Sequence, residues 1–136
     1  VGWESGISPH KNAVLVTGDG AFLSGGLSIE ACFQEKVPII VIVDNNGGLD
    51  CISQQQERLF DNGQHYATDF RDIPFHGMFE GLGGHGELVT KREEFAPAMQ
   101  RAIASGKTAC INVKCRGVIS PIVAATSDKR DKASIE

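Results

Sequence analysis

Two apolar runs, each ending in a polar turn that contains glycine, constrain the fold of this chain most strongly. The first run is AVLV at 13–16 and ends in TGDG at 17–20; the second is PIIVIV at 38–43 and ends in DNNGG at 44–48. Short, fully apolar runs rich in Val and Ile are typical of buried strands in a parallel sheet. The 24 residues between GDG and NN can form a crossover helix. We therefore expect both turns at the same edge of one sheet.

The residues of the two turns favour a site for a phosphate and a metal ion. Gly18 and Gly20 permit close backbone approach, and the start of the following helix attracts an anion. Asp19 would repel a phosphate unless a divalent cation lay between them, and the side-chain oxygens of Asn45 and Asn46 are hard ligands that suit Mg²⁺. Taken alone, Asp19 in the first turn could simply cap the following helix, and Asn45 and Asn46 in the second could simply form a turn. Their joint occurrence after two buried strands favours the ligand site.

At these residues the chain resembles the thiamine diphosphate enzymes. GDG, the 24-residue spacer and NN form the signature of that family, and GDGAF, EKVP and IIVIVDNN fit its diphosphate-binding domain. The likeness extends from about residue 13 to residue 113. It implies an α/β fold of three layers, α/β/α, with a mostly parallel sheet and the cofactor lying across the carboxyl ends of the strands.

The resemblance also implies which residues hold the cofactor. Asp19, the side-chain oxygen of Asn46 and the backbone carbonyl of Gly48 correspond to the Mg²⁺ ligands of the family. The backbone N–H groups of Gly20 and Ala21 correspond to those that bind the diphosphate, as the anion-binding character of this turn already suggests. The expected cofactors are thiamine diphosphate and Mg²⁺.

The reaction implied is the cleavage or formation of a carbon–carbon bond next to a carbonyl group. The chain is similar to acetolactate synthases, oxalyl-CoA decarboxylases and 2-hydroxyacyl-CoA lyases, so a small 2-oxo acid or an acyl-CoA is the expected substrate. In the family an activating glutamate comes from a pyrimidine-binding domain of the same or another chain. We therefore expect this chain to act in a homo-oligomer or hetero-oligomer and to be inactive alone. A non-catalytic structural or regulatory relative and an unrelated Mg²⁺-dependent phosphate-binding domain remain alternatives.

We expect one domain over 1–113 and a partly disordered tail over 114–136. Because the chain opens without Met, in what resembles the last turns of a helix, we expect the domain to be truncated at its amino terminus. The net charge of −4 comes without a basic cluster, which argues against nucleic acid as a partner. No apolar run approaches the roughly 20 residues that a membrane span needs, so we expect a cytoplasmic protein with no membrane contact.

The remaining segments have helical or strand patterns of their own. We expect a crossover helix over 22–35 that covers the sheet with Leu23, Leu27 and Ala31. A polar loop follows over 49–69, with a short helix near 54–60; in the family this region borders the active site and varies with the substrate. Further expected elements are a packing helix over 72–82, a helix over 90–105 capped by Thr90 and Glu93, and a last strand over 108–113.

Several single residues need separate interpretation. GLGGHG at 81–86 satisfies the dinucleotide fingerprint, but a helix precedes it and a short strand at 87–89 follows, which is the reverse of what that fingerprint requires. We expect His85 to be a turn residue, and His65 to be a surface or structural histidine because no partner carboxylate is evident. The four cysteines have no zinc-binding spacing, and we expect reduced thiols, with Cys51 the one that could lie near the substrate.

Overall fold

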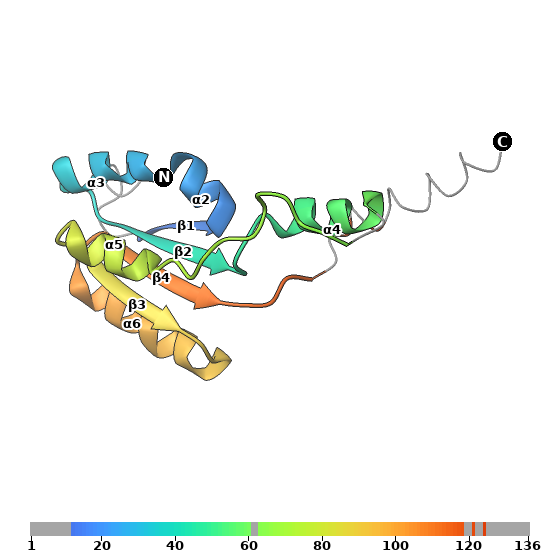
Figure 1. The fold of residues 1–136 in the computed structure, drawn as a ribbon. Helices are drawn as coiled ribbons and strands as arrows, with labels where there is room; N and C mark the ends of the chain where they lie inside the picture. Colours follow the sequence, from blue (N-terminus) through green and yellow to red (C-terminus); the bar gives the residue numbers. More distant parts are fainter. Residues whose placement is uncertain (1–11, 61–62, 119–120, 122–123, 125–136) are drawn as a thin grey trace.

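The computed structural model describes residues 12–60 and 63–118 together with Pro121 and Ala124. Figure 1 shows the elements, which follow one another in this order: β1 (Ala13–Gly18), α2 (Asp19–Gly25), the 3₁₀ helix η1 (Gly26–Ile29), α3 (Glu30–Gln34), β2 (Ile39–Asn45), α4 (Asp50–Leu59), α5 (Phe75–Gly81), β3 (His85–Val89), the 3₁₀ helix η2 (Arg92–Glu94), α6 (Phe95–Ser105) and β4 (Ala109–Lys114).

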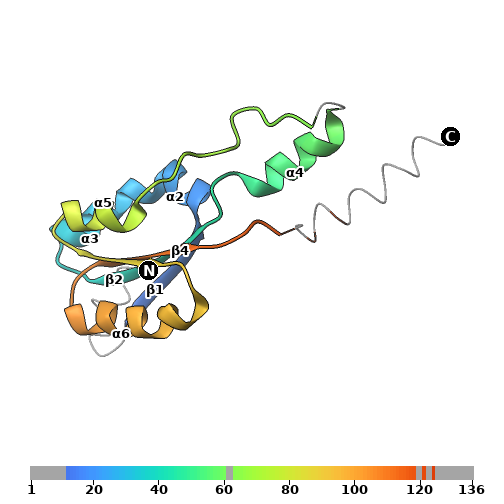
Figure 2. The ribbon, with the colours of Figure 1, turned by 60° about the horizontal axis from the view of Figure 1, so that its bottom comes forward.

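The four strands form one parallel sheet in the order β1-β2-β4-β3. Helices α2, α3 and α5 cover one face and α6 covers the other, so the expected three-layer α/β/α fold is confirmed (Figures 1 and 2). In the register of the first pair, Gly18 lies opposite Asp44. Because the pair is parallel, the turns that follow β1 and β2 leave the sheet side by side, as the crossover argument predicts.

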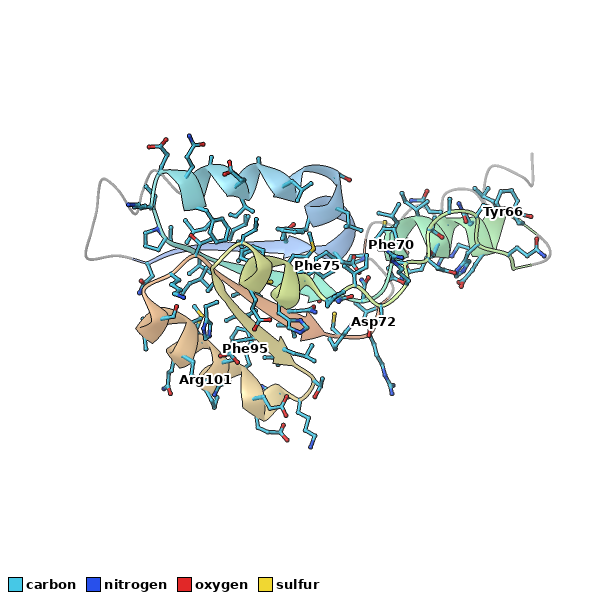
Figure 3. The ribbon with its side chains drawn as sticks, turned by 60° about the vertical axis from the view of Figure 1, so that its left-hand side comes forward. Tyr66, Phe70, Asp72, Phe75, Phe95 and Arg101 are labelled. Atoms are coloured by element: carbon cyan, nitrogen blue, oxygen red, sulfur yellow. The ribbon has the colours of Figure 1, made fainter. Side chains whose placement is uncertain are left out.

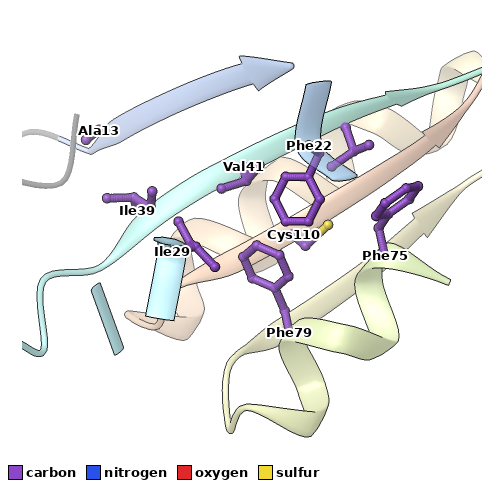
Figure 4. Close-up of a cluster of buried hydrophobic side chains, with 9 residues drawn as sticks. Ala13, Phe22, Ile29, Ile39, Val41, Phe75, Phe79 and Cys110 are labelled. Atoms are coloured by element: carbon purple, nitrogen blue, oxygen red, sulfur yellow. The ribbon is translucent and has the colours of Figure 1, made fainter. Parts of the chain in front are cut away.

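Two apolar cores lie on the two faces of the sheet. The core under α2, α3 and α5 contains the inward side chains of β2 and a group of phenylalanines (Figure 4). Phe22 packs edge-on against Phe75, with ring centroids 5.5 Å apart, and Phe79 contacts both Phe22 and Phe33. Phe75 and Phe79 are fully buried, and together these rings fix α5 against the crossover segment.

The prediction for the crossover helix is wrong in two respects. The segment is not one helix, because α2 ends at Gly25 and the 3₁₀ turn η1 follows it. The predicted stripe is also wrong, since Leu23 and Leu27 are 43% and 69% exposed, whereas Phe22 and Ile29 are buried. Two consecutive glycines weaken the helix, and a 3₁₀ turn has fewer residues per turn than an α-helix. The apolar positions predicted by counting 3.6 residues per turn from Leu23 therefore do not face the sheet.

Smaller differences concern the later elements. The packing helix begins at Phe75, and its predicted apolar residue Leu82 is 47% exposed. His85 is the first residue of β3 and not part of a turn, because its N–H pairs with the Thr108 carbonyl. The cap near residue 90 uses a different glutamate from the one predicted: Glu94, not Glu93, accepts the backbone N–H of Thr90 at 2.9 Å.

Helix α4 is longer than expected and extends beyond the carboxyl ends of the strands (Figures 1 and 2). We call residues 50–60 and 63–66 the arm. Phe60 and Tyr66 stack edge-on at its far end, where Figure 3 labels Tyr66, and both are exposed. Ile52 and Leu59 are also exposed apolar side chains of this helix. The arm thus presents apolar surface that the described part of the chain does not cover.

The edge strand β1 is uncovered as well. Val14 and Val16 are 38% and 68% exposed, since α6 packs mainly on β3 and β4. On the opposite face, Leu15 and Thr17 line an open hollow of about 280 Å³. Within the described residues, no helix is long and apolar enough to span a membrane. The predicted amino-terminal truncation concerns residues 1–11, which lie outside the described residues, as does most of the predicted tail.

Candidate functional site at the carboxyl edge of the sheet

The buried carboxylate of Asp19 joins the two turns. Asp19 is only 2% exposed and begins α2. Its Oδ2 accepts the backbone N–H groups of Gly47 at 2.8 Å and Gly48 at 3.1 Å, and its Oδ1 accepts the N–H of Gly20 at 2.7 Å. Hydrogen bonds to a charged acceptor are stronger than neutral ones. The GDG and NNGG turns, separated in sequence by the crossover segment, therefore form one constellation.

The Asn46 side chain contributes an oxygen that has no partner. Among the described residues, Asn46 Oδ1 is the buried side-chain oxygen for which the structure gives no hydrogen-bond donor. Such an orphaned acceptor costs free energy unless something pairs with it. Gly47, the next residue, has φ = +87°, a conformation that favours glycine and reverses the chain toward Asp19. A buried carboxylate and an unpartnered amide oxygen, on two turns that are hydrogen-bonded to each other, are the kinds of ligand that fit a hard cation such as Mg²⁺.

The loop after the arm returns to the same turn. Gly48 and Asp69 form an antiparallel bridge, in which Leu49 N–H donates to Thr68 at 2.8 Å and Phe70 N–H donates to Gly47 at 2.8 Å. Phe70, labelled in Figure 3, lies where the arm meets the body of the domain. Ser53 of α4 donates to the Thr68 hydroxyl at 2.8 Å and ties the base of the arm to this bridge. The loop after the arm is thus hydrogen-bonded to the turn at residues 45–48, which we call the metal turn because it carries two of the predicted Mg²⁺ ligands.

A buried polar network behind the turn was not foreseen from the sequence. Asn45 and Asn112 are 4% and 0% exposed, and Asn45 Nδ2 donates to Asn112 Oδ1 at 2.9 Å. Asn112 Nδ2 in turn lies 3.2 Å from Nδ1 of His76, on α5. The only signal in the sequence is a single asparagine inside the apolar strand TACINV, which is too slight to identify a partner.

Three of the four cysteines, Cys32, Cys110 and Cys115, have the features of inert thiols. Burial raises the pKa of Cys110 to about 12 and also raises the pKa of Cys32, in agreement with their predicted core positions. Cys115 lies next to the site and donates to the Asp44 carboxylate; burial, followed by this carboxylate, raises its pKa to about 12. A protonated thiol is a poor nucleophile and a poor metal ligand. Cys51 is exposed on α4.

The two other histidines of interest, His65 and His85, pair with carboxylates that are not among the predicted metal ligands. His65 contacts Asp69 at 2.9 Å and Glu57 at 2.8 Å, two partner carboxylates that the sequence alone did not make evident. Its hydrogen bonds with Asp69 and then Glu57 raise the pKa of His65. His85 contacts Glu87, which also accepts two bonds from Arg101 and has a lowered pKa, chiefly because of Arg101.

Neither of these clusters is arranged to hold a metal ion. In the part of the chain that the structure describes, no three His, Cys, Asp or Glu side chains gather as metal ligands. The predicted metal site instead combines one carboxylate with amide and carbonyl oxygens. GLGGHG lies between α5 and β3, so the reason for rejecting the dinucleotide fingerprint is confirmed.

Comparison with known proteins gives the same result as the fold and the two turns. Residues 1–113 match the family model for the C-terminal TPP binding domain of thiamine pyrophosphate enzymes. An acetolactate synthase large subunit of Mycobacterium tuberculosis is 34% identical over 106 residues, which cover 77% of this chain and 19% of that protein. A 2-hydroxyacyl-CoA lyase of Oryza sativa is 30% identical over 131 residues, covering 89% of this chain and 21% of the relative.

Solved structures with the same fold include two decarboxylases. A thiamine diphosphate-dependent 4-hydroxybenzoylformate decarboxylase of Rhodococcus jostii superposes with a TM-score of 0.66 at 26% identity, covering 83% of this chain and 21% of that one. A benzoylformate decarboxylase of Polynucleobacter necessarius has a TM-score of 0.73 at 21% identity, covering 87% and 22%. This chain thus spans about a fifth of the length of these relatives. On these matches, the chain belongs to the thiamine pyrophosphate enzymes, and it carries their C-terminal cofactor-binding domain.

Proposed function

We propose that this chain supplies the metal and diphosphate half of a thiamine diphosphate site. Asp19, Asn46 Oδ1 and the Gly48 carbonyl would hold Mg²⁺, which would be shared with two diphosphate oxygens. The observation that carries this proposal is the buried, unpartnered Asn46 oxygen in the turn whose Gly47 and Gly48 N–H groups donate to the buried Asp19 carboxylate. A cation would pair with the Asn46 oxygen and remove the cost of leaving it unsatisfied, and it would add a positive charge to the three N–H groups that the Asp19 carboxylate already accepts.

The diphosphate would bind at the first turn of α2. Gly18 ends β1 and lets the backbone approach closely, and the Ala21 N–H faces the anion in this assignment. The Gly20 N–H donates to Asp19 Oδ1, so its proposed role requires Asp19 to exchange this donor for the cation. When bound, thiamine diphosphate supplies the carbanion that attacks a carbonyl and the ring that accepts the electrons of the broken bond. The residues of this chain orient that ring through the diphosphate.

The complete reaction would be carbon–carbon cleavage or formation next to a carbonyl, on a small 2-oxo acid or an acyl-CoA, in the cytoplasm. The activating glutamate would come from a pyrimidine-binding domain of the same or another chain, and this chain would be inactive alone. Two observations support a need for further protein around it: the exposed Val14 and Val16 on edge strand β1, and the exposed apolar side chains of the arm. Family membership sets aside the unrelated phosphate-binding domain.

A calorimetric titration of thiamine diphosphate, first with Mg²⁺ and then with EDTA, tests the proposal. We expect binding that requires the metal, and we expect it to be lost in Asn46→Leu, which keeps the approximate size but removes the amide oxygen. The matched control is Gln34→Leu, which removes an exposed amide of α3. Equal affinity in EDTA, or unchanged affinity in Asn46→Leu, would contradict the ligand assignment.

The non-catalytic alternative requires a different measurement. If the chain binds the cofactor but shows no turnover of 2-oxo acids when combined with a pyrimidine-binding domain from a relative, the structural or regulatory interpretation would replace the enzymatic one. The presence of both Asp19 and Asn46 argues against that outcome, because a relative that had lost cofactor binding would have no need of a buried unpartnered oxygen.

A further inference from the structure

We infer that Asn112 is a positioning residue for the metal turn: through Asn45 it fixes the direction of the Asn46 oxygen and of the turn that follows. This inference rests on the proposed metal site. Asn112 lies on β4, 67 positions beyond Asn45, and its side-chain hydrogen bonds are with Asn45, the Ile73 carbonyl and His76, none of which is a proposed ligand. Its effect would therefore pass through its neighbour and not through the metal.

The contacts of Asn112 link three elements immediately behind the turn. Its Oδ1 accepts from Asn45 Nδ2, at the end of β2, at 2.9 Å, and its Nδ2 lies 3.2 Å from His76 Nδ1 on α5. The backbone of Asn45 is also held by β4, because Cys115 N–H donates to the Asn45 carbonyl at 3.2 Å. Both the side chain and the backbone of the residue before Asn46 are thus anchored to one strand.

The Ile73 carbonyl determines which way both amides point. Asn45 Nδ2 lies 3.4 Å from this oxygen and Asn112 Nδ2 lies 3.5 Å from it. A carbonyl oxygen only accepts hydrogen bonds, so each amide must direct its NH₂ group toward it. Asn112 Nδ2 is consequently a donor, and His76 Nδ1 must accept.

Burial makes this arrangement one of few that the turn can adopt. Asn112 is completely buried, and a polar side chain in such a place is costly unless every group is paired. Here each amide finds its partner only while Asn45 keeps its present orientation. Rotation of Asn45 would leave Asn112 Oδ1 without the donor that it now has, so the network opposes movement of Asn45 and of the turn that follows it, in which Gly47 and Gly48 donate to Asp19. An apolar residue at position 112 would fill the space without this constraint.

The test compares Asn112→Leu with Cys110→Ala in the full 136-residue chain. Cys110 is on the same strand and the same face, two residues earlier, and is also completely buried, so its truncation damages the core without touching the network. Asn112→Ser, whose hydroxyl is too short to reach Asn45, serves if Asn112→Leu does not fold. The first readout is amide hydrogen exchange of Gly47 and Gly48, which donate to Asp19, relative to Ile42 within β2.

In the Asn112 variants we expect amide exchange at Gly47 and Gly48 to accelerate about tenfold relative to Ile42. In Cys110→Ala the ratio of these exchange rates to that of Ile42 should stay at its wild-type value. The second readout is Mn²⁺ affinity in the presence of thiamine diphosphate, followed by paramagnetic resonance. It should fall roughly 10- to 100-fold in the Asn112 variants, as is common when residues that orient metal ligands are removed.

An unchanged exchange ratio in the Asn112 variants would overturn the inference, as would a fall in Mn²⁺ affinity that is equally large in Cys110→Ala. If the wild-type chain binds no Mn²⁺ with thiamine diphosphate, the proposed function fails for the isolated chain. The exchange ratio then still decides whether Asn112 orients the turn, so the two failures can be told apart.

Discussion

Replacing Gly48 by alanine should destabilise the domain through the backbone bridge to Thr68 and Asp69. A Cβ atom at Gly48 would lie 2.5 Å from the Thr68 carbonyl oxygen, closer than the 3.0 Å below which such contacts are essentially never found. The two strands of the bridge would have to move apart by at least half an ångström. That displacement would stretch two hydrogen bonds that are now 2.8 Å long, Leu49 N–H to Thr68 and Phe70 N–H to Gly47. Because the obstacle is backbone and not a flexible side chain, it cannot simply rotate aside.

The size of the effect follows from those two bonds. Each contributes about 1 kcal/mol, so their loss costs about 2 kcal/mol. The smaller conformational entropy of alanine in the unfolded chain offsets about 0.5 kcal/mol. We therefore expect the free energy of unfolding to fall by about 1.5 kcal/mol. In urea this would lower the midpoint by about 1 M without changing the slope.

The matched control is Gly81→Ala at the end of α5, where an added Cβ meets no atom within 4 Å. Alanine is favoured over glycine in helices, so this variant should be as stable as the wild type or slightly more stable. Equal midpoints for Gly48→Ala and Gly81→Ala would refute the idea that the bridge holds the turn rigidly. If Gly48→Ala loses protection from hydrogen exchange only at the amides of Leu49 and Phe70, the damage lies at the bridge.

Three further predictions concern titration and thiol chemistry. Because Arg101 lowers the pKa of Glu87, this pair should stabilise the fold above about pH 4.3, and that contribution should be lost as the pH falls through the lower pKa of the folded state. In Glu87→Gln the urea midpoint should no longer show this fall at acid pH. The raised pKa of His65 has the opposite effect on stability: the contribution of this histidine to the free energy of unfolding is complete below about pH 6.5 and is lost as the pH rises through the folded pKa. His65→Gln should therefore remove this change from the profile of urea midpoints against pH, and NMR titration of the imidazole gives the pKa directly. Iodoacetamide should modify exposed Cys51 in the native protein, whereas Cys110, buried and with a pKa of about 12, should react only on unfolding, as mass spectrometry would show.

The strands and the meeting of the two turns could be predicted because each depends on a dense local signal. Six consecutive apolar residues at 38–43 leave little choice but a buried strand, and a right-handed crossover then places Asp19 near Asn46. The helix between them was harder to predict, because two glycines change its geometry and shift the buried face from Leu23 to Phe22.

What the sequence did not reveal are pairings between distant residues. Asn45 and Asn112 are 67 positions apart, and nothing near Asn112 distinguishes it from a tolerated polar residue in a strand. The same holds for His65, whose carboxylates lie on α4 and in the following loop. Pairings of this kind depend on tertiary structure, and no periodicity in the chain encodes them.

The bridge between the metal turn and the loop after the arm has a consequence for how such a domain can diversify. Both of its hydrogen bonds join backbone atoms, so they impose almost no requirement on side-chain identity at Leu49 or Phe70. Substitutions within the arm could therefore change its exposed surface while the chain returns to the same place beside the turn at 45–48. A turn of fixed geometry and a segment of variable sequence can thus share one short stretch of polypeptide, so that the segment can change without loss of the turn.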